Sequence, residues 1–253
     1  VLARPGTRFA REALYAAGAA EHMDVVNMHP YGLPAPPEAE EGSRLLALTL
    51  KGPASFEAVR ELRPLLARHG DGAKPIWLSE VAWDGGVTEP DLEERFRFFQ
   101  SSPLDQARYL VRSALLARLW GAEQYAWLSL PDLPDEIGTI WARSGLIDAR
   151  GVPRPVLVAT ALMMHEVGAA TVEGEVPGLP ERAWGVRFRT PDGARVDALW
   201  SLDPLAVRVA PAAGGGGSVR TFLGGSTPRA FGADGTELAV GPSPLYVRTS
   251  GPA

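Results

Sequence analysis

The sequence has 253 residues, of which 45% are hydrophobic and 22% are charged, with a formal net charge of −5 and no cysteine. This composition is ordinary for a globular protein and excludes collagen-like and disordered chains. Disulfides and thiolate metal sites are excluded by the lack of cysteine, and no apolar run approaches the ~18 residues of a membrane-spanning helix. Lys and Arg are scattered, so neither nucleic acid nor a membrane is an expected partner.

The distribution of glycine and proline predicts two domains. Residues 169–253 are about a third of the chain but contain half of its 28 glycines. Residues 1–168 alternate short apolar runs with helix-like stretches, which is typical of βα units around a parallel sheet. Residues 169–253 have only short alternating runs separated by turns, which is typical of a small antiparallel β domain. We therefore place the domain boundary near Gly168.

The elements of the first domain follow a helix-strand rhythm. Buried strands are expected at residues 25–28, 75–79 and 124–129, and helices at residues 8–20, 55–69, 104–120 and 153–164, the last opening with a proline. In the second domain, strands are expected at residues 186–189, 195–200, 205–209, 237–240 and 245–248. The glycine run 214–217 is interpreted as a flexible loop between strands.

Polar and aromatic residues follow the expected strands of the first domain. The first strand leads into His29 and Tyr31, the second into Glu80 and Trp83, and the third contains Trp127. In parallel α/β folds the functional groups gather at these strand ends. Indoles stack on the faces of sugar rings, and carboxylates act as acid, base or nucleophile at the anomeric carbon. The pattern indicates a carbohydrate site.

Glu80 carries most weight, because a carboxylate directly after a buried apolar run is costly unless it has a function. A solvated loop residue is the alternative. His29 is either a site residue or an ordinary core or loop histidine. The hydroxyl of Tyr31 is expected to hold a carboxylate or a sugar hydroxyl. Trp83 and Trp127 are each equally consistent with core packing and with a stacking platform.

Three further acidic residues and one tryptophan receive less specific interpretations. Asp132, Asp135 and Glu136 form a cluster that is expected to be solvated, with a contact to substrate as the less favoured alternative. Trp77 is interpreted as barrel core or as packing that faces a helix. No metal-ligand spacing, Ser-His-Asp order or phosphate-binding glycine loop is present, so neither a metal nor a cofactor is expected.

These motifs resemble retaining glycoside hydrolases of the clan with (β/α)8 barrels and two catalytic glutamates, and glycoside hydrolase family 39 most closely. Residues 24–31 are similar to the sixth strand of that barrel with its His-x-Tyr end, residues 74–83 to the seventh strand, and residues 123–130 to the eighth. Residues 145–148 and the prolines after them resemble the closing segment. The resemblance implies the later half of a TIM barrel in residues 1–168, from the end of strand five to helix eight. It also implies a β-sandwich accessory domain in residues 169–253.

The resemblance assigns roles to the candidate residues. Glu80 corresponds to the nucleophile, Tyr31 to the donor that orients it, His29 to a sugar-hydroxyl contact, and Trp127 to the floor of the subsite that binds the cleaved sugar. Trp83 is a further candidate for substrate contact. The substrate is then a glycan or β-glycoside, with xylosides as the example that the family offers.

The clan's acid/base glutamate, which follows an asparagine on the fourth strand, has no counterpart in the sequence. We therefore expect this chain to be part of a larger protein, and to be inactive or very weak by itself because general acid catalysis contributes ~10² to 10⁴-fold. Half a barrel also has open strand edges. We expect either a second polypeptide to complete it or the chain to self-associate.

Two other functional interpretations stay open from the sequence. One is a carbohydrate-binding or structural remnant that kept the aromatic residues and lost catalysis. The other is an unrelated α/β enzyme, which requires Glu80 to lie away from any cleft. The sequence starts with Val1 and shows no signal peptide, so the compartment, extracellular or cytoplasmic, is undetermined. The sugar, the linkage and the exo or endo action are undetermined as well.

Overall fold

The structure is a computed structural model that describes residues 2–3, 8–39, 56–86, 100–133, 142–209, 216–232 and 234–249. The chain divides into two units, Val1–Val156 and Leu157–Ala253. This division crosses the helix whose far end is near Gly168, and the assignment of domains to residues 1–168 and 169–253 stays a prediction. None of the helices described has the length and apolar character that a bilayer crossing requires.

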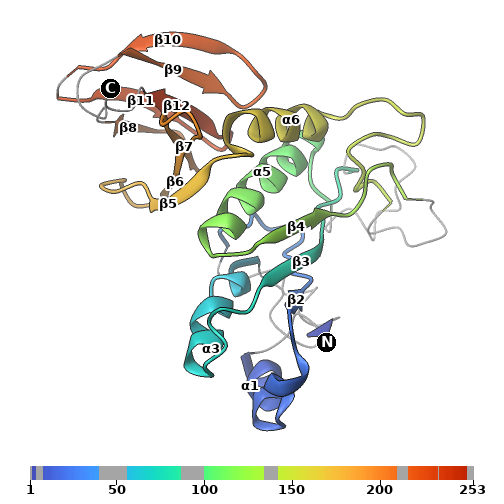
Figure 1. Cartoon of the computed structure of the whole chain (residues 1–253). Helices are drawn as coiled ribbons and strands as arrows, with labels where there is room; N and C mark the ends of the chain where they lie inside the picture. The colour runs from blue at the N-terminus through green and yellow to red at the C-terminus, as the bar shows by residue number, and fades with distance from the viewer. Residues whose placement is uncertain are drawn as a thin grey trace. The chain divides into compact units, whose positions relative to one another are not determined.

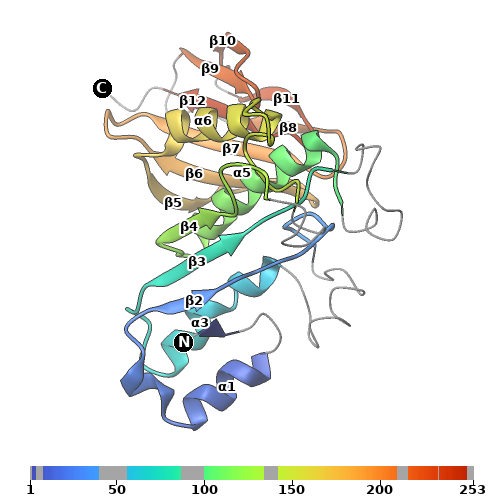
Figure 2. The same cartoon turned by 90° about the vertical axis from the view of Figure 1, so that its right-hand side faces the viewer.

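The first unit contains a four-stranded parallel sheet, most of which can be followed in Figures 1 and 2. Its strands lie in the order β1 (Leu2–Ala3), β2 (Val26–Met28), β3 (Ile76–Val81) and β4 (Gln124–Trp127). Every neighbouring pair is parallel. The predicted parallel sheet is confirmed, and so are its three predicted strands. Parallel neighbours bring the carboxyl ends of β2, β3 and β4 to one edge of the sheet.

The helices of this unit alternate with the strands. Those within the described residues are α1 (Arg8–Ala16), the 3-10 helix η1 (Ala19–His22), the 3-10 helix η2 (Phe56–Val59), α3 (Leu62–Arg68) and α5 (Pro103–Leu119). The helix expected at 55–69 is divided, because Pro64 has no N–H and is tolerated only in the first turn of a helix. Starting α3 at Leu62 meets that condition. The helix expected at 8–20 is also divided, at Gly18, which has a left-handed φ of 80°.

Helix α5 connects β3 to β4 and provides much of the core. Ser102 caps its amino end by accepting a hydrogen bond of 3.0 Å from the backbone N–H of Asp105, and Pro103 occupies the first turn. Its inner face buries Leu110, Val111 and Leu115. The same helix carries Tyr109, which contacts Trp83, and Arg112, which pairs with Glu38.

Trp77 corrects the sequence interpretation, since its side chain is 40% exposed rather than packed in the core. Its neighbours Ile76 and Leu78 are fully buried. Side chains alternate along a strand, so Trp77 is directed to the face of the sheet opposite to theirs. The part of the chain that the structure describes leaves this indole accessible.

The second unit is an antiparallel β structure, as predicted. Six strands lie in the order β10-β9-β12-β7-β6-β5, and β11 pairs with β8 in a two-stranded ribbon. The bounds are β5 Thr171–Glu175, β6 Ala183–Arg189, β7 Arg195–Ser201, β8 Leu205–Val209, β9 Gly216–Thr221, β10 Ser226–Ala230, β11 Thr236–Val240 and β12 Leu245–Thr249. All five predicted strands of this region are confirmed within β6, β7, β8, β11 and β12.

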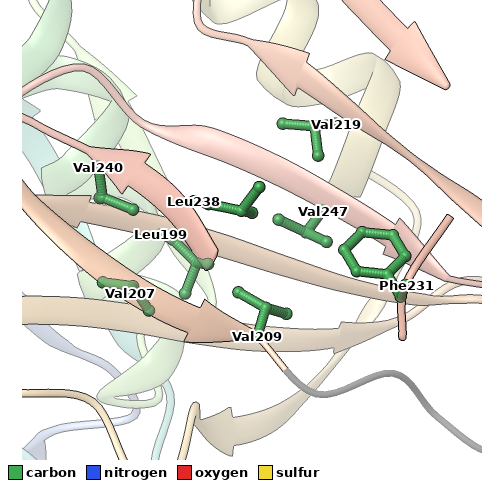
Figure 3. Packing of buried hydrophobic residues seen from close by; sticks show 8 residues of the cluster. All are labelled: Leu199, Val207, Val209, Val219, Phe231, Leu238, Val240 and Val247. Atoms are coloured by element: carbon green, nitrogen blue, oxygen red, sulfur yellow. The ribbon is translucent and has the colours of Figure 1, made fainter. Parts of the chain in front are cut away.

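The two faces of the six-stranded sheet have different neighbours. On one face, side chains of β7, β9 and β12 meet those of the β8-β11 ribbon in a single cluster (Figure 3). The cluster contains Leu199, Val207, Val209, Val219, Phe231, Leu238, Val240 and Val247. On the other face, Glu166 of helix α6 (Pro155–Val167) pairs with Arg220 of β9 at 3.0 Å.

The glycine run 214–217 is not simply a loop, because Gly216 and Gly217 begin β9 and pair with β10 and β12. Residues 214 and 215 lie outside the described residues. A Cβ at Gly217 would be 2.3 Å from the carbonyl oxygen of Arg248 and 2.8 Å from the ring of Phe231. Glycine is therefore required for this close approach, which hydrophobic alternation does not reveal.

Candidate active site

The register of the parallel sheet sets the position of every candidate residue. Met28 pairs with Leu78, and Val81 pairs with Trp127, so the ends of β2, β3 and β4 lie side by side. Between Leu78 and Val81 the register shifts by one residue relative to β4. Ser79 and Glu80 therefore lie in a β-bulge, a feature that redirects side chains and is frequent beside active sites.

Glu80 is contacted by both residues that the sequence placed beside it. The hydroxyl of Tyr31 donates a hydrogen bond of 2.6 Å to Oε2 of Glu80, and Nδ1 of His29 lies 3.2 Å from the same oxygen. The Glu80 side chain is 42% exposed and that of His29 is 20% exposed. The carboxylate is thus fixed at one oxygen while it remains open to solvent.

His29 joins Glu80 to the residue that precedes it. Its Nε2 lies 2.9 Å from the Ser79 hydroxyl. A carboxylate only accepts hydrogen bonds, so Nδ1 is the protonated nitrogen in the contact with Glu80. In the neutral ring Nε2 then accepts from Ser79 Oγ. Oδ1 of Asn27 accepts from the backbone N–H of Ser79 at 3.3 Å, which ties the bulge to β2.

Tyr31 is a hydrogen-bond donor throughout the neutral pH range. Burial, followed by the hydrogen bond to Glu80 and the charge of that carboxylate, raises the pKa of the Tyr31 phenol above its ordinary value. The phenol therefore stays protonated. Its short contact with Glu80 has the length expected for a hydrogen bond from a neutral hydroxyl to a charged oxygen.

The segment that carries Tyr31 is anchored at two points beyond it. The indole N–H of Trp83 donates to the carbonyl of Ala35 at 2.9 Å. Glu38 forms an ion pair with Arg112 of α5, in which Nε of Arg112 is 2.8 Å from Oε1 of Glu38. Both side chains of this pair are almost completely buried. These contacts hold the chain after β2 over the end of β3.

Trp127 and Trp83 form a stacked pair, with ring centroids 6.2 Å apart and planes inclined by 17°. Trp127 is half-buried, and its indole N–H donates to the carbonyl of Ser144 at 2.8 Å. Trp83 is fully buried and also contacts the rings of Phe56 and Tyr109. Burial leaves Trp83 no surface for a sugar, so we reassign it from substrate contact to the packing that supports Trp127.

One of the three acidic residues after β4, Asp132, differs from the expected solvated cluster. Asp132 is buried and pairs with Arg154 at 2.7 Å. Asp135 and Glu136 lie outside the described residues. Among the residues described, no group of three or more His, Cys, Asp or Glu is arranged to hold a metal ion.

Sequence reasoning missed three residues around the site. Ser79 contacts His29, Asn27 fixes the bulge, and Asp84 is completely buried in the segment that follows β3. Ser79 and Asn27 were next to residues already singled out, so their place at the strand ends was the available signal. The carboxylate of Asp84 is held by the nearby Gly86 and by Arg143, which is 59 residues away along the chain and could not be paired with it from local pattern.

Comparison with solved structures places this fold among glycoside hydrolases. A family 39 glycoside hydrolase from the gut symbiont Bacteroides cellulosilyticus WH2 superposes with a TM-score of 0.71 at 20% identity, over 94% of this chain and 47% of that one. The family 51 arabinofuranosidase from Xanthomonas axonopodis pv. citri gives 0.58 at 12% identity, over 98% and 57%. The family 30 xylanase C catalytic domain from Talaromyces cellulolyticus gives 0.51 at 11%, over 95% and 48%.

These likenesses show the fold, and they agree with the resemblance seen in the motifs. The chain spans about half the length of the solved structures that it matches. A sheet of parallel strands alternating with helices, with glycoside hydrolases as structural neighbours, is consistent with a TIM-barrel portion. No protein-family model matches the sequence. No curated protein sequence matches it either.

Proposed function

We propose that this chain carries the nucleophile side of a retaining glycosidase active site, with Glu80 as the nucleophile. The observation that supports this most is the 2.6 Å hydrogen bond from Tyr31 to Oε2 of Glu80 at the carboxyl edge of a parallel sheet. Trp127 lies at the end of the adjacent strand, paired with Val81. A fixed carboxylate beside an indole is the combination that sugar chemistry requires.

In the proposed reaction Glu80 attacks with the oxygen that Tyr31 and His29 do not hold. Oε1 forms a bond to the anomeric carbon while the glycosidic C–O bond breaks, and the departing oxygen takes a proton from a general acid. Water then attacks the glycosyl ester and restores the carboxylate. Tyr31 keeps Oε2 oriented throughout. Both ring nitrogens of His29 face protein groups, so its proposed contact with a sugar hydroxyl requires that hydroxyl to replace Ser79 at Nε2.

Trp127 is the proposed platform for the sugar ring. Its indole is stacked on Trp83 on one side, so it is rigid, and it remains partly accessible. An indole stacks on the apolar face of a pyranose and loses little conformational entropy in doing so when it is already fixed. The proposed substrate is accordingly a glycan or β-glycoside, with β-xylosides as the first compounds to test.

Among the residues that the structure describes, neither buried aspartate near this edge of the sheet suits the role of general acid, and we propose that another part of the full protein supplies it. In a retaining enzyme the two carboxyl groups are about 5–5.5 Å apart. Asp84 and Asp132 are also near this edge of the sheet, but each is buried and already accepts hydrogen bonds from backbone N–H groups. Glycosides with poor leaving groups are then cleaved only when the missing carboxyl is supplied. We further propose that residues 169–253 are the β-sandwich accessory domain.

Activated glycosides test this proposal, because a dinitrophenolate leaves without protonation. We expect slow release of dinitrophenol from dinitrophenyl β-xyloside, β-glucoside or α-arabinofuranoside, and loss of that release in Glu80→Gln. The matched control is Glu123→Gln, which changes a glutamate beside the opposite, amino end of β4. Sugar binding that persists in Glu80→Ala, with no release of dinitrophenol by the unmodified protein, would instead indicate a binding protein.

A further inference from the structure

Three consecutive residues hold the indole of Trp127 from its N–H edge. The carbonyl of Ser144 accepts the Trp127 N–H at 2.8 Å. On one side of Ser144, the backbone N–H of Arg143 donates to Oδ2 of Asp84 at 2.8 Å. On the other side, the backbone N–H of Gly145 donates to Oδ1 of Asp132 at 3.0 Å. The acceptor of the indole is thus bracketed by two buried carboxylates.

We propose that Asp84 and Asp132 are positioning residues for Trp127, acting through the backbone of residues 143–145. They contact neither the indole nor the sugar. Each fixes one peptide N–H next to Ser144. The Ser144 carbonyl, which accepts from the indole N–H, in turn sets the side-chain orientation of Trp127. The inference rests on the proposed function only where it concerns sugar binding, because the orientation of the indole is a property of the free protein.

The surroundings of Asp84 show a site built around its carboxylate. Its Oδ1 accepts from the backbone N–H of Gly86 at 2.8 Å, and its main-chain carbonyl accepts from both the N–H and the hydroxyl of Ser101 at 2.8 Å. The side-chain amide of Gln106 donates to the carbonyls of Trp83 and Arg143, both at 2.9 Å. Both carboxylate oxygens are therefore committed, and the segment after β3 is tied to residue 143.

Both carboxylate oxygens of Asp132 also accept hydrogen bonds, one of them from the N–H of Gly145. Its Oδ2 accepts from the guanidinium of Arg154 at 2.7 Å, and the two side chains are 3% and 10% exposed. The backbones also touch directly, since a Cβ at Gly145 would lie 2.3 Å from the N of Asp132 and 2.5 Å from the carbonyl oxygen of Ile147. Glycine at 145 permits the approach that its N–H bond to Asp132 requires.

The amide variants Asp84→Asn and Asp132→Asn test the proposal with little change in shape. In each case one of the two accepting oxygens becomes an NH₂ group that cannot accept, so the carboxylate loses a hydrogen bond either to the N–H of residue 143 or 145 or to its second donor, Gly86 or Arg154. The readout is hydrogen exchange of the indole N–H groups by NMR, with Trp127→Phe to assign the Trp127 signal. Trp83 provides an internal reference, because its N–H donates to Ala35, which neither carboxylate contacts.

We expect exchange of the Trp127 N–H to accelerate about tenfold in both variants, as for one lost buried hydrogen bond, while that of Trp83 changes far less. The control is Asp71→Asn. Asp71 lies in the segment before β3, and its carboxylate accepts from Tyr15 and Lys74. This variant should leave the exchange rate of the Trp127 N–H unchanged. Equal acceleration of Trp83 and Trp127, or none at Trp127, would overturn the proposal. If one of the two variants does not fold, the exchange rate of the Trp127 N–H in the other variant still tests the proposal.

A sugar measurement separates this inference from the proposed function. Dinitrophenyl β-xyloside should bind about tenfold more weakly to each amide variant than to the unmodified protein. Failure of the unmodified protein to bind any of the three dinitrophenyl glycosides would count against the proposed function, and the exchange measurement would still decide the role of the two carboxylates. Unchanged sugar affinity with accelerated Trp127 exchange would overturn the link from indole position to binding.

Discussion

The hydroxyl of Tyr31 donates a 2.6 Å hydrogen bond to Oε2 of Glu80, which joins the segment after β2 to the bulge at the end of β3. The same oxygen faces His29 at 3.2 Å. The Tyr31 hydroxyl therefore orients this oxygen of the carboxylate, with His29 beside it. The Glu80 side chain nevertheless remains partly exposed to solvent.

Tyr31→Phe should slow the release of dinitrophenol by roughly 10- to 100-fold, the effect of losing a hydrogen bond to a charged group worth about 1.5–3 kcal/mol. Tyr15→Phe is the matched control, since the Tyr15 hydroxyl also donates to a carboxylate, that of Asp71, at 2.8 Å. Steady-state rates at saturating glycoside compare the two. Equal rates in Tyr31→Phe and the unmodified protein would show that this contact has no catalytic role.

Asp84 should make the stability of the fold depend on pH below neutrality. Burial raises the pKa of Asp84 to about 6 from 3.8, although hydrogen bonds from Arg143, Gly86 and Gln100 and the charge of Arg143 act to lower it. Between these two pH values the folded chain keeps a proton that the unfolded chain has lost. The free energy of unfolding therefore falls as pH rises through this window, by on the order of 3 kcal/mol.

Comparison with Asp84→Asn isolates that contribution, because the amide does not titrate while all other groups are common to both proteins. Urea unfolding between pH 4 and 7 should show the stability advantage of the unmodified protein shrinking as pH rises through about 6. An advantage that is constant or grows over this range would contradict the raised pKa.

Arg112→Met should destabilise the first unit by about 3–5 kcal/mol, because it leaves the buried Glu38 carboxylate without its guanidinium partner. The double variant Arg112→Met with Glu38→Met should recover much of that loss, as an apolar pair needs no compensation. Arg60→Met is the control, since the pair of Arg60 with Glu57 is exposed and of little energetic value. A double variant less stable than Arg112→Met would contradict this account of the pair.

Trp77 should promote self-association, because its indole is 40% exposed on the sheet and offers apolar surface to another molecule. Sedimentation velocity over a range of concentrations should show oligomers that decrease in Trp77→Ser. Leu130→Ser is the control, since Leu130 is 61% exposed but lies outside the strands. A monodisperse monomer at every concentration, with Trp77 intact, would show that the sheet face that carries Trp77 does not mediate self-association.

The sequence predicted the parts of the site that depend on local pattern. Apolar runs located β2, β3 and β4, and the parallel arrangement then brought Tyr31, His29 and Glu80 to one edge, where the structure confirms their contacts. The bulge at Ser79 was not predictable, because it depends on the register of β3 against β4.

Other features depend on contacts between distant segments. The burial of Asp132 requires Arg154, and that of Asp84 requires the segment at Arg143, so neither acidic residue differs in sequence from a solvated one. Strand β10 is exposed along its whole length and therefore has no hydrophobic alternation to reveal it. Trp77 shows the converse, an apolar residue that looks like core and is accessible.

The most direct measurement of the central claim is the covalent trapping of the nucleophile by a deoxyfluoro-β-xylosyl fluoride, whose fluoride departs without a general acid. Intact-mass spectrometry and peptide mapping should show one fluoroglycosyl group, attached to Glu80, and no attachment in Glu80→Gln, while Glu123→Gln is modified like the unmodified protein. Attachment to a different residue, or equal modification of Glu80→Gln, would contradict the assignment of Glu80 as the nucleophile.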